Sequence, residues 1–178
     1  MSRFDQLISL GNKIYRVSVI LKKRKLKLYY GKQLQITPDL HFRKGFNILI
    51  SKEGNLSIGK GCFFNFNCSI SCLGSISIGD NSIFGENVKF YDHNHRFSDS
   101  TTLIKDQGYK VGSIKVGNNC WIGSNVTILN NVEIGDNVVI GANCVIQKSI
   151  PSNTIVRCNN ELIMEERRNT VRDLAEVN

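Results

Sequence analysis

The chain has 178 residues, with 23 Lys and Arg against 15 Asp and Glu, which gives a formal net charge of +8. This length is that of one domain with a continuous core, and the excess of positive charge favours an anionic partner. No apolar stretch approaches the length of a bilayer span, and the N-terminus lacks the apolar core of a secretory signal, so we expect a cytoplasmic protein.

Residues 1–33 are predicted to form a short, mostly helical lead-in. Its charge is densest at Lys22–Lys27, where four Lys and one Arg occupy six positions and apolar residues flank the run. Two interpretations stay open: a solvated helix face, or a surface that contacts an anionic membrane or a lipid-linked partner. No aromatic residues are interleaved with the run and no nucleic-acid-binding motif is present, so we expect no nucleic-acid partner.

Residues 34–157 are predicted to form one repeat domain. In residues 34–50 apolar and polar residues alternate, and we interpret this segment as a degenerate first coil. A six-residue period then covers about 54–91 and 114–157. In the later run an aliphatic column recurs at every sixth residue, and a second column of small or branched residues follows four positions after each member. Neither a helix nor a strand keeps such a column in phase, so the pattern predicts a solenoid with three short strands in each coil.

The residues of these columns are expected to form the core. In the later run the first column is Val116, Ile122, Ile128, Ile134, Ile140 and Ile146, and the second is Cys120, Val126, Val132, Val138, Cys144 and Ile150. In the earlier run the first column is Ile58, Phe64, Ile70, Ile78, Phe84 and Phe90, with two residues inserted around Gly74. Because Cys62, Cys68, Cys120 and Cys144 fall in the second column, we expect buried reduced thiols rather than disulfides or a zinc site.

A long loop, at about residues 96–113, interrupts the repeat. His93 and His95 lie where the period breaks, the lone Trp121 follows the loop, and Asn65 and Asn67 precede it. Imidazole takes up a proton near neutral pH, so a histidine at the mouth of a long loop is a candidate general base. The last segment, residues 158–178, is predicted to be a C-terminal helix that caps the open end of the solenoid.

Several segments carry a resemblance to a known family. Asn65-Phe66-Asn67, followed by Ile78-Gly79-Asp80-Asn81, resembles the stretch that lines the acceptor pocket of sugar acetyltransferases, and Asn94-His95-Arg96 resembles the xenobiotic enzymes. The segment Val116-Gly117-Asn118-Asn119-Cys120-Trp121-Ile122-Gly123-Ser124 is close to the family signature. Over about residues 54–157 the chain therefore resembles the hexapeptide-repeat acyltransferases, in the branch of galactoside, maltose and xenobiotic O-acetyltransferases and their capsule and lipopolysaccharide relatives.

The resemblance implies an all-β solenoid, a left-handed parallel β-helix, assembled as a homotrimer with active sites between subunits. It implies acetyl-CoA as the co-substrate and no metal. His95 would be the general base, the backbone N–H of Ser124 would donate to the oxyanion, and Trp121 would pack near the pantetheine arm or thiol. The remaining implied contacts are Asn65, Asn67 and His93 for the acceptor and Gly123, Gly141, Ala142 and Lys148 for CoA.

Two departures from the family pattern bear on the substrates. The acidic residue that assists acceptor binding in galactoside enzymes falls on Leu73, so a different acceptor is expected. The Gly-x-Pro turn with a basic residue near the end of the family's repeat is replaced by Cys158-Asn159-Asn160-Glu161-Leu162. The residues for the nucleotide end of CoA are therefore left unassigned among Arg157, Arg167 and Arg168.

The sequence thus predicts an acetyl-CoA-dependent O-acetyltransferase acting on a sugar hydroxyl of a surface polysaccharide, capsule or lipopolysaccharide O-antigen, or of its precursor. The alternative is N-acetylation of an amino-sugar nucleotide, since the same base can serve an amine. A metal-dependent hydratase on this fold needs three converging histidines, and His41 lies far along the solenoid from His93 and His95. A non-catalytic scaffold would leave His95, Trp121 and the loop without a role.

Overall fold

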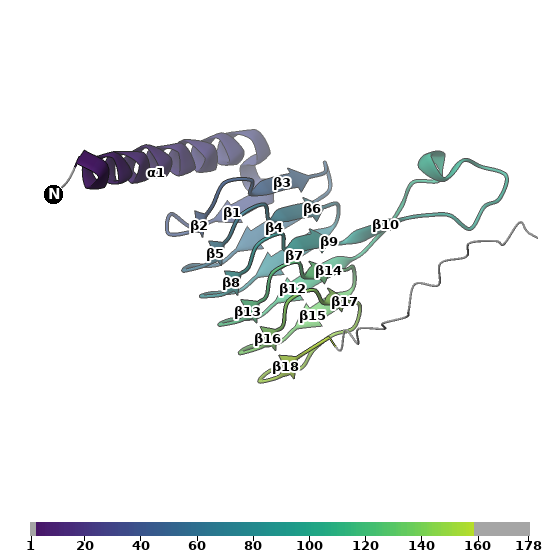
Figure 1. The fold of residues 1–178 in the computed structure, drawn as a ribbon. Coiled ribbons are helices and arrows are strands. Elements are labelled where there is room, and N and C mark those ends of the chain that lie inside the picture. Colours follow the sequence, from purple (N-terminus) through teal and green to yellow (C-terminus); the bar gives the residue numbers. More distant parts are fainter. Residues whose placement is uncertain (1–2, 159–178) are drawn as a thin grey trace, which may run out of the picture.

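The computed structural model of the protein describes the backbone of residues 3–158 and the side chains from Tyr15 onward. It is a parallel β-solenoid of stacked coils, with one long helix across its N-terminal end and a hairpin loop that projects from its side (Figure 1). The predicted left-handed parallel β-helix and its protruding loop are confirmed. The predicted C-terminal helix, apart from Cys158, lies outside the described residues.

The N-terminal helix occupies most of the lead-in at residues 1–33. α1 spans Arg3–Tyr30, and the 3-10 turn η1 (Gly31–Gln33) follows it. Leu, Lys and Arg, which are good helix formers, are frequent in α1, and Pro is absent. Gly31 takes φ +54, a left-handed conformation common where helices end. Within residues 3–158, α1 and the shorter helices all lack an apolar stretch of the length that a bilayer span requires.

Each full coil contributes one strand to each of three parallel sheets. Sheet A contains β1 (Leu34–Ile36), β4 (Asn55–Ile58), β7 (Ser75–Ile78), β12 (Ser113–Val116) and β15 (Val132–Ile134). Sheet B contains β2 (His41–Phe42), β5 (Phe63–Phe64), β8 (Ile83–Phe84), β13 (Trp121–Ile122), β16 (Val139–Ile140) and β18 (Ile155–Val156). Sheet C contains β3 (Asn47–Ile50), β6 (Ser69–Cys72), β9 (Lys89–Tyr91), β14 (Thr127–Ile128) and β17 (Val145–Ile146).

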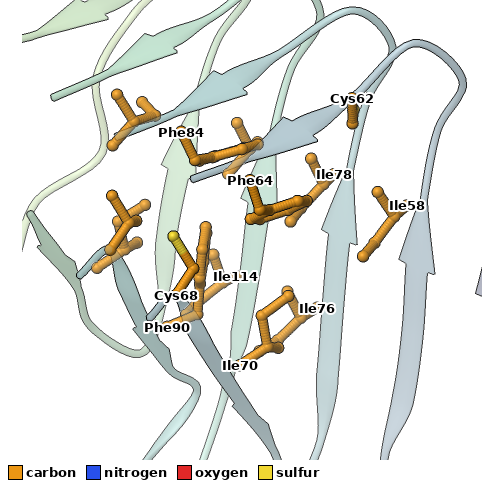
Figure 2. Packing of buried hydrophobic residues seen from close by; sticks show 14 of the residues in the cluster. Ile58, Cys62, Phe64, Cys68, Ile70, Ile76, Ile78, Phe84, Phe90 and Ile114 are labelled. Carbon is orange, nitrogen blue, oxygen red and sulfur yellow. The ribbon is translucent and has the colours of Figure 1, made fainter. Parts of the chain in front are cut away.

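The core lies between the three sheets and confirms the predicted columns. Every residue of both columns in the later run is buried, and so is every member of the first column in the earlier run. Side chains of successive coils stack directly, as the rings of Phe64 and Phe84 do with centroids 4.3 Å apart. Figure 2 shows these rings among Ile78, Ile70 and Phe90 in the interior of the coils. The six-residue period therefore arises from side chains that fill one continuous core.

Asparagine forms many of the turns between sheets. Nine Asn among the described residues have positive φ, a conformation that Asn tolerates better than most residues. Their side chains form ladders: Asn119 Nδ2 donates to Asn137 Oδ1 at 2.9 Å, and Asn137 Nδ2 donates to Asn153 Oδ1 at 3.0 Å. Ile58 pairs with Ile78 rather than with a residue 18 positions on, which confirms the two-residue insertion around Gly74.

The cysteines follow the prediction with one correction. Cys62, Cys68 and Cys120 are buried free thiols, as is Cys72. Cys144, which was also expected to be reduced, is instead paired with Cys158. Cys158 follows the last strand of sheet B, and its Cα lies 5.5 Å from that of Cys144, within the range that a disulfide requires.

Candidate active site

The candidate residues lie at the corners of the solenoid, where the chain passes from one sheet to the next. We call the turn from sheet B to sheet C the B–C corner and the turn from sheet C to sheet A the C–A corner. At the B–C corner Gly85, Gly123 and Gly141 follow β8, β13 and β16, and the N–H of each donates to the carbonyl oxygen at the end of the sheet B strand in the following coil. At the C–A corner the long loop leaves the solenoid between β9 and β12. Residues that stack on one corner therefore come from different repeats.

A groove of about 600 Å³ runs along the B–C corner at the C-terminal half of the solenoid. It brings together five of the predicted site residues, Trp121, Gly123, Ser124, Gly141 and Ala142. The other lining residues are Gly85, Val139, Ile140, Ile155, Val156 and Arg157. Its mostly apolar walls suit an uncharged, flexible chain, and Arg157 adds a positive charge.

Glycines leave backbone N–H groups accessible in this groove. A Cβ on Gly85 would lie 2.6 Å from the nitrogen of Ser124, and a Cβ on Gly123 would lie 2.6 Å from the nitrogen of Ala142. Among residues 3–158, neither the Ser124 nor the Ala142 N–H has an acceptor. Two successive coils thus present unpaired donors along one groove, where they can bind carbonyl oxygens of a ligand.

The long loop is a hairpin whose two arms pair beside the solenoid. β10 (His93–His95) and β11 (Tyr109–Val111) are antiparallel, and the 3-10 turn η2 (Ile104–Asp106) lies between them (Figure 1). Near the tip, hydrogen bonds from Thr101 and Thr102 lower the pKa of Asp99 to about 2. The loop is therefore internally ordered even though it extends away from the coils.

Asp92 anchors the base of this loop, a role that sequence analysis missed. Its carboxylate is fully buried, with Oδ1 accepting the N–H of Leu73 and Oδ2 accepting the N–H of Gly74, both at 2.8 Å. Oδ1 also lies 3.0 Å from Nδ1 of His93. One carboxylate therefore fixes the two-residue insertion and the orientation of the half-buried His93 imidazole. The sequence signals this role only by placing an acidic residue directly before His93, where the six-residue period breaks.

His95 stands at the exposed end of β10. Its ring centroid lies 4.5 Å from that of Tyr109, whose ring also meets the edge of His93 at 5.2 Å. Arg96 Nε donates to the carbonyl oxygen of Tyr109 at 3.1 Å, which ties the two arms together. Tyr109, which sequence analysis did not single out, thus contacts both imidazoles. Of the two histidines, His93 has the carboxylate partner and His95 is open to an incoming molecule.

The predicted acceptor residues lie on the B–C corner, toward the N-terminal end of the groove. Asn65 follows β5, and its Oδ1 accepts the N–H of Phe66 at 2.9 Å. Asn67 takes φ 58 and so serves the turn itself. The Arg43 guanidinium lies over the Phe66 ring at 5.0 Å, which places a cation and an aromatic face next to Asn65. Sequence analysis did not identify Arg43, because it belongs to the preceding coil.

Lys148 does not join the other predicted CoA contacts. It follows β17 and lies on the C–A corner, the corner that carries His93 and His95. The side chain of Asn130, on the coil between, accepts a hydrogen bond from Asn94 of the loop at 3.0 Å. One chain therefore places its histidines and Lys148 on one corner, and its groove on another.

The described residues do not bring a metal centre together. His41 begins β2 in sheet B of the first coil, whereas His93 and His95 lie on the C–A corner several coils along. Within residues 3–158, no three His, Cys, Asp or Glu side chains gather in the manner of a metal site.

Comparison with known protein families identifies hexapeptide repeats in two segments of the chain. A family model described as bacterial transferase hexapeptide (six repeats) matches residues 113–148, and one described as hexapeptide repeat of succinyl-transferase matches residues 55–88. The chain belongs to the hexapeptide-repeat transferase family. A comparison with curated proteins found no match.

Solved structures of this family resemble the chain over most of its length. A maltose O-acetyltransferase from Clostridium difficile 630 is 33% identical, with a TM-score of 0.61, over 69% of this chain and 64% of that one. A galactoside acetyltransferase in complex with coenzyme A is 35% identical, with a TM-score of 0.52, over 70% and 57%. A hexapeptide-repeat acetyltransferase from Vibrio cholerae is 27% identical, with a TM-score of 0.59, over 66% and 64%. The chain thus spans less than two thirds of these relatives.

Proposed function

We propose that this member of the hexapeptide-repeat transferase family transfers the acetyl group of acetyl-CoA to a sugar hydroxyl of a surface polysaccharide, such as a capsule or an O-antigen, or of its precursor. The observation that carries the proposal is the apolar groove of the B–C corner, with the free N–H groups of Ser124 and Ala142 along it. Similar structures are a maltose O-acetyltransferase and a galactoside acetyltransferase bound to coenzyme A. A Vibrio cholerae relative, 28% identical with a TM-score of 0.52 over 69% of this chain and 62% of that one, was solved with acetyl-CoA.

In the proposed reaction His95 is the general base. It removes the proton of the acceptor hydroxyl as the oxygen attacks the thioester carbonyl, so that no free alkoxide forms. Negative charge then develops on the carbonyl oxygen, where the Ser124 N–H donates a hydrogen bond, a contribution of about 3 kcal/mol in comparable sites. As the intermediate collapses, the C–S bond breaks, and the CoA thiolate takes the proton back from His95. Acetyl ester and free CoA are the products.

The groove residues have distinct roles in this proposal. The pantetheine arm lies along the apolar walls, and the Ala142 N–H donates to one of its amide carbonyls. Gly123 and Gly141 allow the arm to approach the backbone, and Trp121, which is 56% exposed, covers the thiol end. Arg157 lies at the end of the same groove and supplies positive charge for the phosphates.

A homotrimer would unite the two corners that one chain keeps apart. The outer face of sheet B carries an apolar ladder in which Ile83, Trp121, Val139 and Ile155 are paired neighbours. The outer face of sheet A is polar, with Lys115 Nζ bonded to Glu133 Oε1 at 2.6 Å. In a ring of three copies each sheet B face can meet the loop-bearing corner of the next copy, and His95 and Lys148 then approach a neighbour's groove.

For the acceptor we propose an anionic sugar. Asn65 would hydrogen-bond the sugar, and the Arg43 guanidinium, held over Phe66, would bind its carboxylate. His93, oriented by Asp92, would contact a neighbouring hydroxyl. We place the reaction in the cytoplasm, where acetyl-CoA is available, and at the inner face of the membrane where lipid-linked precursors are elongated, with contact through the exposed residues of the Lys22–Lys27 segment.

The test is acceptor-dependent release of CoA thiol by the purified protein. Acetyl-CoA is offered with neutral sugars, acidic oligosaccharides and amino-sugar nucleotides, with and without a chelator, and the products are identified by mass spectrometry. We expect thiol release with a hydroxyl acceptor, an alkali-labile acetyl ester, and no effect of the chelator. An amide product would establish N-acetylation instead. Chelator-sensitive CO₂ hydration without thiol release would establish the hydratase. Absence of thiol release with every acceptor would contradict the proposed acetyltransferase activity.

A further inference from the structure

The inner face of α1 packs on the first coil. Val19 is buried, and the Tyr30 hydroxyl donates to the carbonyl oxygen of Ile48 at 3.1 Å. Lys22 donates to the carbonyl oxygen of Phe46, and Lys23 Nζ donates to that of Leu40 at 3.1 Å. Burial lowers the pKa of both lysines. Two of the five charged residues of the run thus hold the helix on the solenoid rather than facing outward.

The opposite face of α1 carries a second apolar stripe. Positions 17, 21, 24 and 28 follow one another at helical spacing, and they lie on the far side from positions 15, 19, 22, 26 and 30. The exposed fractions of the apolar members are 55% for Val17, 58% for Leu21 and 88% for Leu28, and the neighbouring Ile20 is 47% exposed. A helix that already buries one apolar face does not need this second stripe for folding.

Positive charge surrounds this stripe. Arg24 lies within it, and Arg16, Lys25 and Lys27 lie on either side of it, all of them exposed. The sequence has no Asp or Glu between Asp5 and Asp39. An apolar stripe in a purely cationic field is the composition of helices that lie in the headgroup region of anionic bilayers.

We propose that the outer face of α1, defined by Val17, Ile20, Leu21, Arg24 and Leu28, binds the surface of an anionic phospholipid bilayer, with the helix lying in the plane of the interface. Two copies meeting through this face would bring like charges together, whereas anionic headgroups neutralise them. Because α1 lies across the N-terminal end of the solenoid, the coils and the groove would extend away from the bilayer (Figure 1). The surface is independent of acetyl transfer.

The proposal is tested by sedimentation of the full chain with vesicles of phosphatidylcholine alone or with about 30% of the anionic lipid phosphatidylglycerol. The stripe variant is Leu21→Glu with Leu28→Glu, and the charge variant is Arg24→Glu with Lys25→Glu. Lys115→Glu, on the exposed face of sheet A, is the matched control. Thermal melts confirm that each variant is folded, and acetyl transfer to a free acceptor reports on the groove.

We expect the wild type and Lys115→Glu to bind the anionic vesicles only, more weakly at high salt. Both α1 variants should lose at least about ten-fold in partition coefficient while keeping their melting temperature and acetyl transfer. No vesicle binding by the wild type, or equal binding by the stripe variant, would overturn the proposal. A stripe variant that instead lowers the oligomeric state, measured by light scattering, would make this face an interface between copies and would equally overturn it.

Discussion

Two inactive variants of this protein should rescue each other when their substitutions lie on different corners of the solenoid. His95→Ala removes the proposed base from the C–A corner. Ala142→Glu adds bulk and negative charge to the groove of the B–C corner, where CoA would lie. If each active site takes one corner from each of two neighbouring subunits, a mixed trimer contains some sites in which both corners are intact.

The size of the rescue follows from random mixing. With equal amounts of both variants, each corner of a site comes from an intact copy with a chance of one half, so about one site in four has both corners intact. The mixture is prepared by denaturing and refolding the variants together, and thiol release is compared with refolded wild type. Both parents must be inactive alone, and mixed trimers must be verified by native mass spectrometry.

A same-corner pair provides the matched control. Gly141→Glu also lies in the groove, and the nearest atom to its Cβ is the Val156 oxygen at 3.4 Å, so the backbone need not move. Mixed with Ala142→Glu it should give no rescue, because no site then gains an intact groove. Activity near a quarter of wild type for the cross-corner pair alone supports the shared site. Absence of rescue in verified mixed trimers would show that both corners act within one subunit.

Three further predictions concern packing. Gly123→Ala should lower the free energy of unfolding by about 1–3 kcal/mol, because its Cβ would lie 2.6 Å from a backbone nitrogen, whereas Gly141→Ala should leave it unchanged or raise it by up to about 1 kcal/mol. Val132→Asp should prevent folding because it buries an unpaired charge, whereas Asn131→Asp, at an exposed turn with φ 60, should be tolerated. Because burial raises the pKa of Cys68 to about 11, alkylation of this thiol in the native protein at pH 8 should be at least about 100-fold slower than in urea.

Each of these predictions has a direct check. Chemical denaturation compares the two glycine variants, and equal stabilities would contradict the close approach of successive coils. Circular dichroism and thermal melts compare Val132→Asp with Asn131→Asp, and two equally folded proteins would contradict the inward column. Mass spectrometry after timed alkylation follows Cys68, and rapid labelling of the native protein would contradict its burial.

The repeat was predictable because the same physical requirement acts at every sixth residue. Ile122 and Val126 must both enter the core, and the equivalent residues of the other coils must do the same. The periodicity of apolar residues therefore predicts the solenoid and its inward columns. The packing of α1 on the first coil was not predicted, because its inner face combines Val19 and Leu26 with Lys22 and Lys23, and the density of charge obscured this pattern.

The site was only partly predictable, because its corners depend on three-dimensional stacking. The groove residues Trp121, Ser124 and Ala142 were found together because their coils are regular: Trp121 and Ser124 lie on one coil, and Ala142 stacks beside them on the next. Lys148 was grouped with them by resemblance. The irregular loop before Val116 interrupts the repeat, so the sequence does not reveal that Lys148 lies on the same corner as the histidines. Asp92 was missed because its partners are backbone N–H groups of an earlier coil, which side-chain patterns do not reveal.

The most direct measurement of the central claim is steady-state acetyl transfer by His95→Ala beside His93→Ala, both checked for folding. The proposal predicts that His95→Ala lowers kcat by about 10²–10⁴-fold, the range of a lost general base, while His93→Ala acts mainly on the KM for the acceptor. Near-normal turnover by His95→Ala would contradict the proposal. If His93→Ala then lost turnover instead, the base would be the His93 imidazole that the buried Asp92 carboxylate holds.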